Sequence, residues 1–130
     1  MYLRNLSNAV KNIAQHLDDE GIALLICGSP TSEYQRIVDL LVEENVRSVL
    51  FYDKFEKILS NHYTLSKKQV KGQLNFSDLE EVLQCFRIHL KGEYAADMNN
   101  HHEEVLKKFF QRKDRLSVED DSLAYICKHL

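Results

Sequence analysis

The hydrophobic positions along the chain predict a small sheet near the N-terminus. Residues 22–27 form an uncharged apolar run of the length of a buried strand. Ser29 and Pro30 are typical of a helix start, with an N-cap followed by proline at the first helical position. Helically spaced apolar residues follow, and then a second apolar run at 46–52. This order predicts a βαβ unit at about 22–52, parallel and right-handed by default.

The remaining apolar positions recur mostly at helical spacing. We expect helices at about 2–18, at 53–61, from 64 to Gly72, from Ser77 to Gly92, at 95–112 and from Ser117 to the C-terminus. Residues 73–76 are a short connection or a third strand. The expected architecture is one α/β domain, residues 1–130, with a βαβ core at 21–61 and a helical C-terminal part at 64–130 that helps to cover a small parallel sheet.

An all-α fold is the alternative, because short apolar runs cannot be assigned to strand or helix by periodicity alone. Residues 24–26 fit a buried helix, and residues 46–59 fit one long helix. In that case the chain is a helical bundle or a short helical-repeat domain.

Composition is that of an ordinary globular protein, with 44% hydrophobic and 28% charged residues. The net charge of −3 disfavours a surface that attracts phosphate, so we expect no nucleic-acid partner. Three widely separated cysteines in apolar contexts indicate reduced core thiols. We see no signal peptide and no apolar stretch of membrane-spanning length, so we expect a cytoplasmic protein without membrane contact.

The first predicted helix carries a narrow apolar seam at alternating spacings of three and four. Its members are Leu3, Leu6, Val10, Ile13 and Leu17. Such a seam is typical of a coiled coil, although it covers barely two heptads. It packs either on the domain's own core or on another chain, and it is the surface that we expect a homodimer to use.

The turn after the first apolar run is the candidate ligand site. A helix N-terminus presents free backbone amides, which bind anions and lower the pKa of a nearby thiol. The candidate residues are Cys27, Gly28, Ser29, Thr31 and Ser32. Residues 27–32 resemble the phosphocysteine loop of sugar-transport IIB domains, and this resemblance implies a phosphoacceptor or thiol enzyme centred on Cys27. The alternative for Cys27 is a buried thiol at the end of a strand.

Histidines and carboxylates at spacings of three and four form a second candidate. These residues are His89, Glu93, Asp97, His101 and Glu104. On one uninterrupted helix they would line a single face and could ligate zinc, manganese or iron. Gly92 interrupts this stripe, which favours a solvated surface, and we expect no metal or other cofactor. We find no motif that pairs a nucleophile with a base, so we do not expect an enzyme.

Residues 65–90 are spaced like a helix-turn-helix. Residues 76–78 together with Val82 and 86–87 resemble the second DNA-binding half-motif of AraC-type regulators, which implies a DNA-binding regulator. Acidic residues open the second helix, however, and phosphate repels them.

Over about residues 21–112 the order of elements, including Tyr52-Asp53 and residues 72–74, resembles the MEDS sensory domain of bacterial regulators. That resemblance implies a RecA-like α/β sensor without catalysis. We therefore expect a non-catalytic regulatory or sensory module that acts through a protein partner, through self-association or through a small ligand. DNA binding and Cys27 chemistry are the alternatives.

Overall fold

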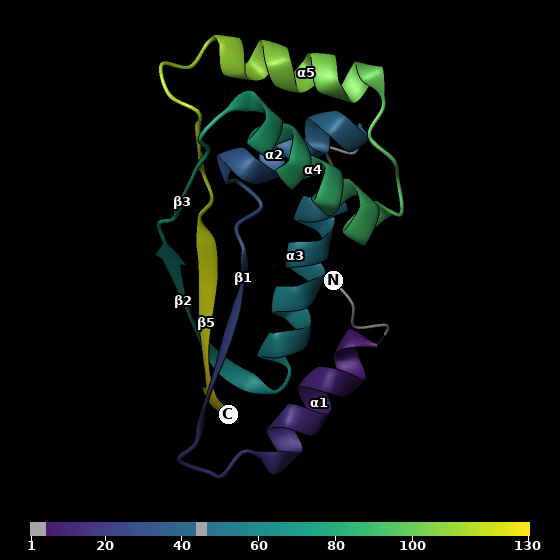
Figure 1. The fold of residues 1–130 in the computed structure, drawn as a ribbon. Coiled ribbons are helices and arrows are strands. Elements are labelled where there is room, and N and C mark those ends of the chain that lie inside the picture. The colour runs from purple at the N-terminus through teal and green to yellow at the C-terminus, as the bar shows by residue number, and fades with distance from the viewer. Residues whose placement is uncertain (1–4, 44–46) are drawn as a thin grey trace.

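The computed structural model describes residues 5–43 and 47–130. The elements of this part of the chain are α1 (Leu6–His16), β1 (Ile22–Gly28), α2 (Glu33–Val42), α3 (Arg47–Ser60), β2 (Tyr63–Val70), β3 (Gln73–Asn75), α4 (Leu79–Tyr94), α5 (Asn100–Gln111), β4 (Ser117–Glu119) and β5 (Ser122–His129). Figure 1 shows the long strands side by side, with α1 and α3 along the sheet and α2, α4 and α5 gathered at one end.

The main sheet is antiparallel, with β5 in the centre between β1 and β2. Strands β3 and β4 form a second, two-stranded antiparallel sheet. Their register continues that of β2 and β5, since the pairing of Val70 with Ser122 is followed in step by that of Gln73 with Glu119. The two pairs are therefore one long ribbon, interrupted where Gly72 faces Asp120.

The predicted parallel βαβ unit is wrong. Strand β1 lies where the sequence predicts it, and helix α2 begins three residues later than predicted. Residues 47–52, however, belong to α3 and not to a second strand. Phe55 and Leu59 explain the difference, because they extend the apolar pattern at helical spacing and are buried. The strand that pairs with β1 is β5, and it runs antiparallel. The RecA-like sheet implied by the MEDS resemblance is wrong for the same reason. These strands also exclude the all-α fold, although the long helix that this alternative expected at 46–59 is confirmed from residue 47 onward by α3.

The C-terminal part is less helical than predicted. The segment from 64 to Gly72 is mostly β2, so the first helix of the predicted helix-turn-helix does not exist. The segment that follows Ser117 is β4 and β5. Long-range pairing makes residues 122–129 a strand and not a helix. Strand β5 pairs on both sides with strands that lie more than fifty residues earlier in the sequence. Of the two possibilities for residues 73–76, the strand is confirmed by β3. Gly92 does not end α4, which continues to Tyr94.

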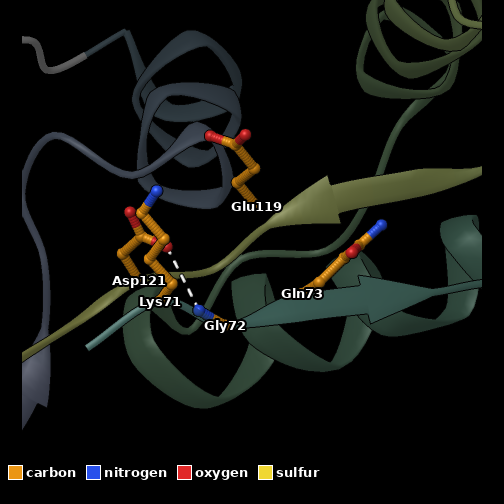
Figure 2. A pocket seen from close by; sticks show the side chains of 5 residues that line it. All are labelled: Lys71, Gly72, Gln73, Glu119 and Asp121. Carbon is orange, nitrogen blue, oxygen red and sulfur yellow. Dashed lines mark hydrogen bonds between the residues drawn. The ribbon is translucent and has the colours of Figure 1, made fainter.

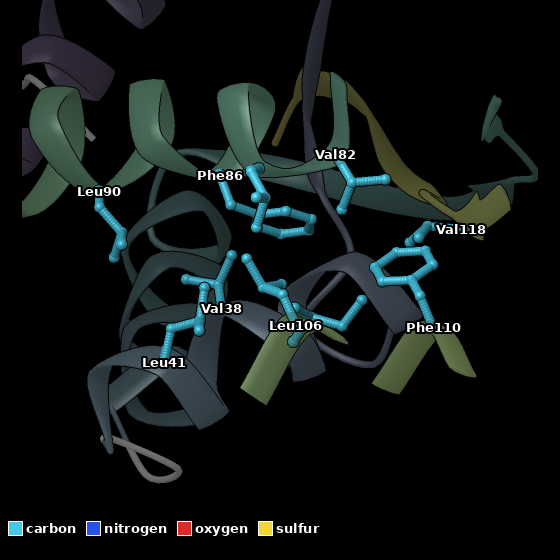
Figure 3. Packing of buried hydrophobic residues seen from close by; sticks show 10 residues of the cluster. Val38, Leu41, Val82, Phe86, Leu90, Leu106, Phe110 and Val118 are labelled. Atoms are coloured by element: carbon cyan, nitrogen blue, oxygen red, sulfur yellow. The ribbon is translucent and has the colours of Figure 1, made fainter. Parts of the chain in front are cut away.

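Two apolar clusters hold the elements together. One lies between the sheet and helices α1 and α3, and its buried members are Val10, Phe55, Leu59, Tyr63, Leu123, Tyr125 and Cys127. The other joins α2, α4 and α5 to β4 (Figure 3), and its buried members are Ile37, Val38, Leu41, Val82, Leu83, Phe86, Leu90, Leu106, Phe110 and Val118. Of the helices that the structure describes, α1 and α3 pack on the β1-β5-β2 sheet, and both lie on the same face of it.

Candidate functional site

The turn before α2 uses its own side chains to bond its backbone amides. Ser32, and not the predicted Ser29, is the N-cap, and its hydroxyl oxygen accepts a 3.1 Å hydrogen bond from the Gln35 N–H. The Thr31 N–H donates to the Ser29 hydroxyl oxygen at 3.4 Å, and the Ser32 N–H donates to the Ser29 carbonyl oxygen at 3.3 Å. Both serines are buried. Three backbone N–H groups at the predicted anion site therefore already donate to acceptors within the turn. Anion binding at this turn stays a prediction.

Cys27 lies at the end of β1 in surroundings that oppose nucleophilic chemistry. Its half-buried side chain packs against the cluster formed with α1 and α3. Burial raises the pKa of the Cys27 thiol, and a hydrogen bond with the Tyr52 side chain offsets this only in part. Because the thiolate is the reactive form of cysteine, a raised pKa makes an activated nucleophile harder to form here.

The five candidate metal ligands are divided among α4, α5 and the loop between them. They are His89, Glu93, Asp97, His101 and Glu104. Asp97 forms an ion pair with Lys91 at 2.9 Å, and His89 lies against α2. Among the residues that the structure describes, no three histidine, cysteine or carboxylate side chains come together as a metal site.

A partly buried polar contact joins α2 to α4, and sequence reasoning missed it. The Tyr34 hydroxyl oxygen lies 3.0 Å from His89 Nδ1, and the Tyr34 ring stacks on Phe86 with ring centroids 5.0 Å apart. Burial raises the pKa of the Tyr34 hydroxyl and lowers that of His89. Both pKa shifts favour the neutral forms of the two side chains. A neutral tyrosine and a neutral histidine can share a hydrogen bond in a partly buried place without the cost of burying a charge, which suits a structural contact. Its two residues are 55 positions apart, so no local pattern could have indicated the pair.

A hollow of about 340 Å³ lies where the long ribbon is interrupted (Figure 2). The residues that line it are Lys71, Gly72, Gln73, Glu119 and Asp121. The Asp121 carboxylate accepts hydrogen bonds from the Gly72 N–H at 3.2 Å and from Gln69 Nε2 at 2.9 Å. This carboxylate therefore holds the two strands of the ribbon together. The lining carries both signs of charge, so it singles out no class of ligand.

Strand β1 presents large apolar side chains to solvent. Ile22, Leu24 and Ile26 are 57%, 58% and 65% exposed, although they belong to a regular strand. They alternate with Ala23, Leu25 and Cys27, whose side chains pack toward α1 and α3. Because successive side chains of a strand point to opposite faces, Ile22, Leu24 and Ile26 lie on the face of the sheet away from these helices. Val70 is also exposed, but it belongs to β2, at the opposite edge of the sheet, and is not part of this patch. A contiguous exposed apolar patch is typical of a surface that meets another protein.

The backbone of these same three residues forms the free edge of the sheet. The Ser29 N–H donates a 2.8 Å hydrogen bond to the Asp121 carbonyl oxygen, in register with the β1–β5 pairing. Since bonded and non-bonded pairs alternate in antiparallel sheets, the odd-numbered residues of β1 bond to β5. The three exposed residues therefore direct their N–H and C=O groups outward, where no described residue pairs with them. The outward carbonyl oxygen of Gly28 accepts the Tyr52 hydroxyl.

The opposite edge of the sheet differs in chemistry. Strand β2 carries Lys67 and Lys68, and Lys71 follows it directly. The Lys67 ammonium lies 2.8 Å from Oε1 of Glu56. Lysines on edge strands discourage pairing with another strand. Strand β1 has no charged residue, so it is the edge that remains open to pairing.

Most of the predicted N-terminal seam that the structure describes packs inside the protein. Val10 is buried in the cluster with α3 and the sheet, and Leu6 and Leu17 pack against that cluster. Ile13 remains exposed, and Leu3 lies outside the described residues. Self-association through this seam stays a prediction, but little of its apolar surface is available.

The sequence matches no protein-family model and no curated protein. Within residues 5–43 and 47–130, no helix combines the length and the apolar character needed to cross a bilayer. Strand β1 is therefore the candidate site on the strength of its geometry alone.

Proposed function

We propose that the protein is a non-catalytic regulatory module of the cytoplasm that acts by binding a protein through strand β1. One observation carries the proposal: Ile22, Leu24 and Ile26 combine exposed apolar side chains with outward backbone groups that pair with none of the described residues. A strand added to a sheet edge gains main-chain hydrogen bonds from such groups and specificity from alternate side chains. Both sources of affinity are present on β1.

Two further observations support the other parts of the proposal, the lack of catalysis and the cytoplasmic location. Burial raises the pKa values of the Cys27 and Cys85 thiols, which opposes thiol catalysis at either position. All three cysteines are free, as is usual for proteins in a reducing compartment.

Photo-crosslinking in cells of the source organism tests this function. A benzoylphenylalanine at position 24 should yield a discrete covalent adduct with a protein. The same residue at position 88 is the matched control, because Ile88 of α4 is a similarly exposed apolar side chain away from β1. An adduct from position 24 and none from position 88 supports the proposal. No adduct from position 24, or equal adducts from both, contradicts it.

A further inference from the structure

We infer that the partner of strand β1 is a second copy of this chain, whose β1 pairs antiparallel with the first across a twofold axis at Leu24. This inference rests on the proposed function and names its partner. The pairing would join the two three-stranded sheets into one continuous sheet. A twofold contact closes on itself, so it limits association to a dimer.

The backbone of β1 selects this register. An antiparallel pair exchanges two hydrogen bonds between opposite residues whose polar groups face each other. An axis at Leu24 places Leu24 opposite its own copy and Ile22 opposite Ile26, so that all three outward-facing residues take part in about six hydrogen bonds. An axis at Leu25 would instead need Gly28, whose carbonyl oxygen already accepts the Tyr52 hydroxyl.

The side chains of β1 suit a copy of the same strand. Residues on one face of an antiparallel pair meet across the interface, so the three exposed side chains of each copy would cover those of the other. Residues 22–28 carry no charge, so self-pairing brings no like charges together. Pairing of β2 with its own copy would instead bring lysines together.

The small contact area of an edge pairing sets the expected affinity. Interfaces below about 1,200 Å² are typical of weak, reversible complexes. We expect a Kd on the order of 10 μM, measurable by sedimentation equilibrium.

Sedimentation equilibrium of the purified full chain is the first part of the test. The wild type should form a concentration-dependent dimer, and Leu24→Lys should shift the equilibrium at least about tenfold toward monomer. Val70→Lys is the matched control, because Val70 is exposed on the same sheet but at the opposite edge, in β2. It should dimerise like the wild type. A monomeric wild type, open-ended association, or equal loss of dimer in both variants overturns the inference.

Cysteine crosslinking tests the register without requiring a destabilising charge. In Leu24→Cys the two new cysteines would have Cα atoms about 5.5 Å apart, within disulfide range. In Ile26→Cys the two copies would be offset by about 14 Å along the strand. Mild oxidation should give a disulfide dimer of Leu24→Cys only, and the wild type reports any crosslinking by native cysteines. Crosslinking of both variants or of neither contradicts the register.

A monomeric chain that still forms a photo-adduct with another protein at position 24 overturns this inference but supports the proposed function.

Discussion

The backbone N–H of Asp120 donates a 3.0 Å hydrogen bond to the carbonyl oxygen of Gly72, where both strands of the long ribbon are interrupted. The close approach of these two residues requires glycine. A Cβ atom at position 72 would lie 2.5 Å from the Asp120 carbonyl oxygen, which belongs to the backbone and cannot swing away. This contact between Gly72 and Asp120 lies where the main sheet meets the β3–β4 pair.

Gly72→Ala should therefore lower the free energy of unfolding by about 1–3 kcal/mol, because the strands must separate to admit the methyl group. Urea denaturation measures the change. Gly28→Ala is the control: its Cβ would meet no atom within 4 Å, and its effect should stay within about 0.5 kcal/mol. Equal effects of the two substitutions would contradict the role of the close approach.

The Tyr34–His89 contact predicts a loss of stability in mild acid. Burial lowers the pKa of His89 below its ordinary 6.5 in the folded protein, although the carboxylates of Glu93 and Asp120 act in the opposite direction. Below pH 6.5 the unfolded chain therefore binds a proton at this histidine more readily than the folded chain does. The free energy of unfolding should fall as the pH decreases from 6.5 toward the lowered pKa.

His89→Gln should flatten this dependence, since glutamine does not titrate but can still accept a hydrogen bond from the Tyr34 hydroxyl. The measurement is urea denaturation at a series of pH values between 5 and 7. His101→Gln, on the exposed surface of α5, should retain the wild-type slope. An unchanged slope in His89→Gln would assign the acid sensitivity to other groups.

The Lys113–Glu33 ion pair links the start of α2 to the chain before β4. The Lys113 ammonium lies 2.5 Å from Oε1 of Glu33 and also donates to the Ser117 carbonyl oxygen. The two side chains of the ion pair are only 23% and 17% exposed. Lys113→Met should lower the free energy of unfolding by about 2–4 kcal/mol, because it leaves a poorly solvated carboxylate without its cation.

The exposed pair of Lys91 and Asp97 supplies the control, with side chains 67% and 86% exposed. Lys91→Met should cost at most about 1 kcal/mol, because water screens this pair. Denaturant unfolding of the two variants compares them directly. If Lys91→Met cost as much as Lys113→Met, burial would not be the cause of the difference.

The packing of α1 predicts that two positions of the N-terminal seam differ in how well they tolerate a charged side chain. Val10 is 2% exposed, whereas Ile13 is 39% exposed. Val10→Asp should lower the free energy of unfolding by more than about 3 kcal/mol, because it buries an unpaired carboxylate. Ile13→Asp should change it by about 1 kcal/mol or less. Thermal unfolding followed by circular dichroism separates the two, and a tolerated Val10→Asp would place α1 outside the core.

Local pattern predicted several elements correctly. The apolar run of β1 has strand length, and α2, α4 and α5 show clear helical spacing over ten or more residues. The segment of β5 is different, because Leu123, Ile126 and Leu130 fit a helix while Leu123, Tyr125 and Cys127 fit a strand. Pairing on both sides decides between the two patterns, and the strands involved are distant in the sequence.

The candidate site shows the same division. The sequence places Ile22, Leu24 and Ile26 in a strand and predicts that the strand is buried, because nothing polar interrupts it. It also predicts self-association, but on the N-terminal seam and not on β1. Only the strand order reveals that β1 is an edge with one uncovered face.

By itself the sequence determined which segments are apolar and how their hydrophobic residues repeat, since these are properties of neighbouring residues. The tertiary structure decided that the sheet is antiparallel, that β5 lies at its centre and that β1 remains open. These features depend on pairing between segments far apart in the chain, whose stability comes from backbone hydrogen bonds and shared burial. No local pattern encodes which segment a strand will find as its neighbour.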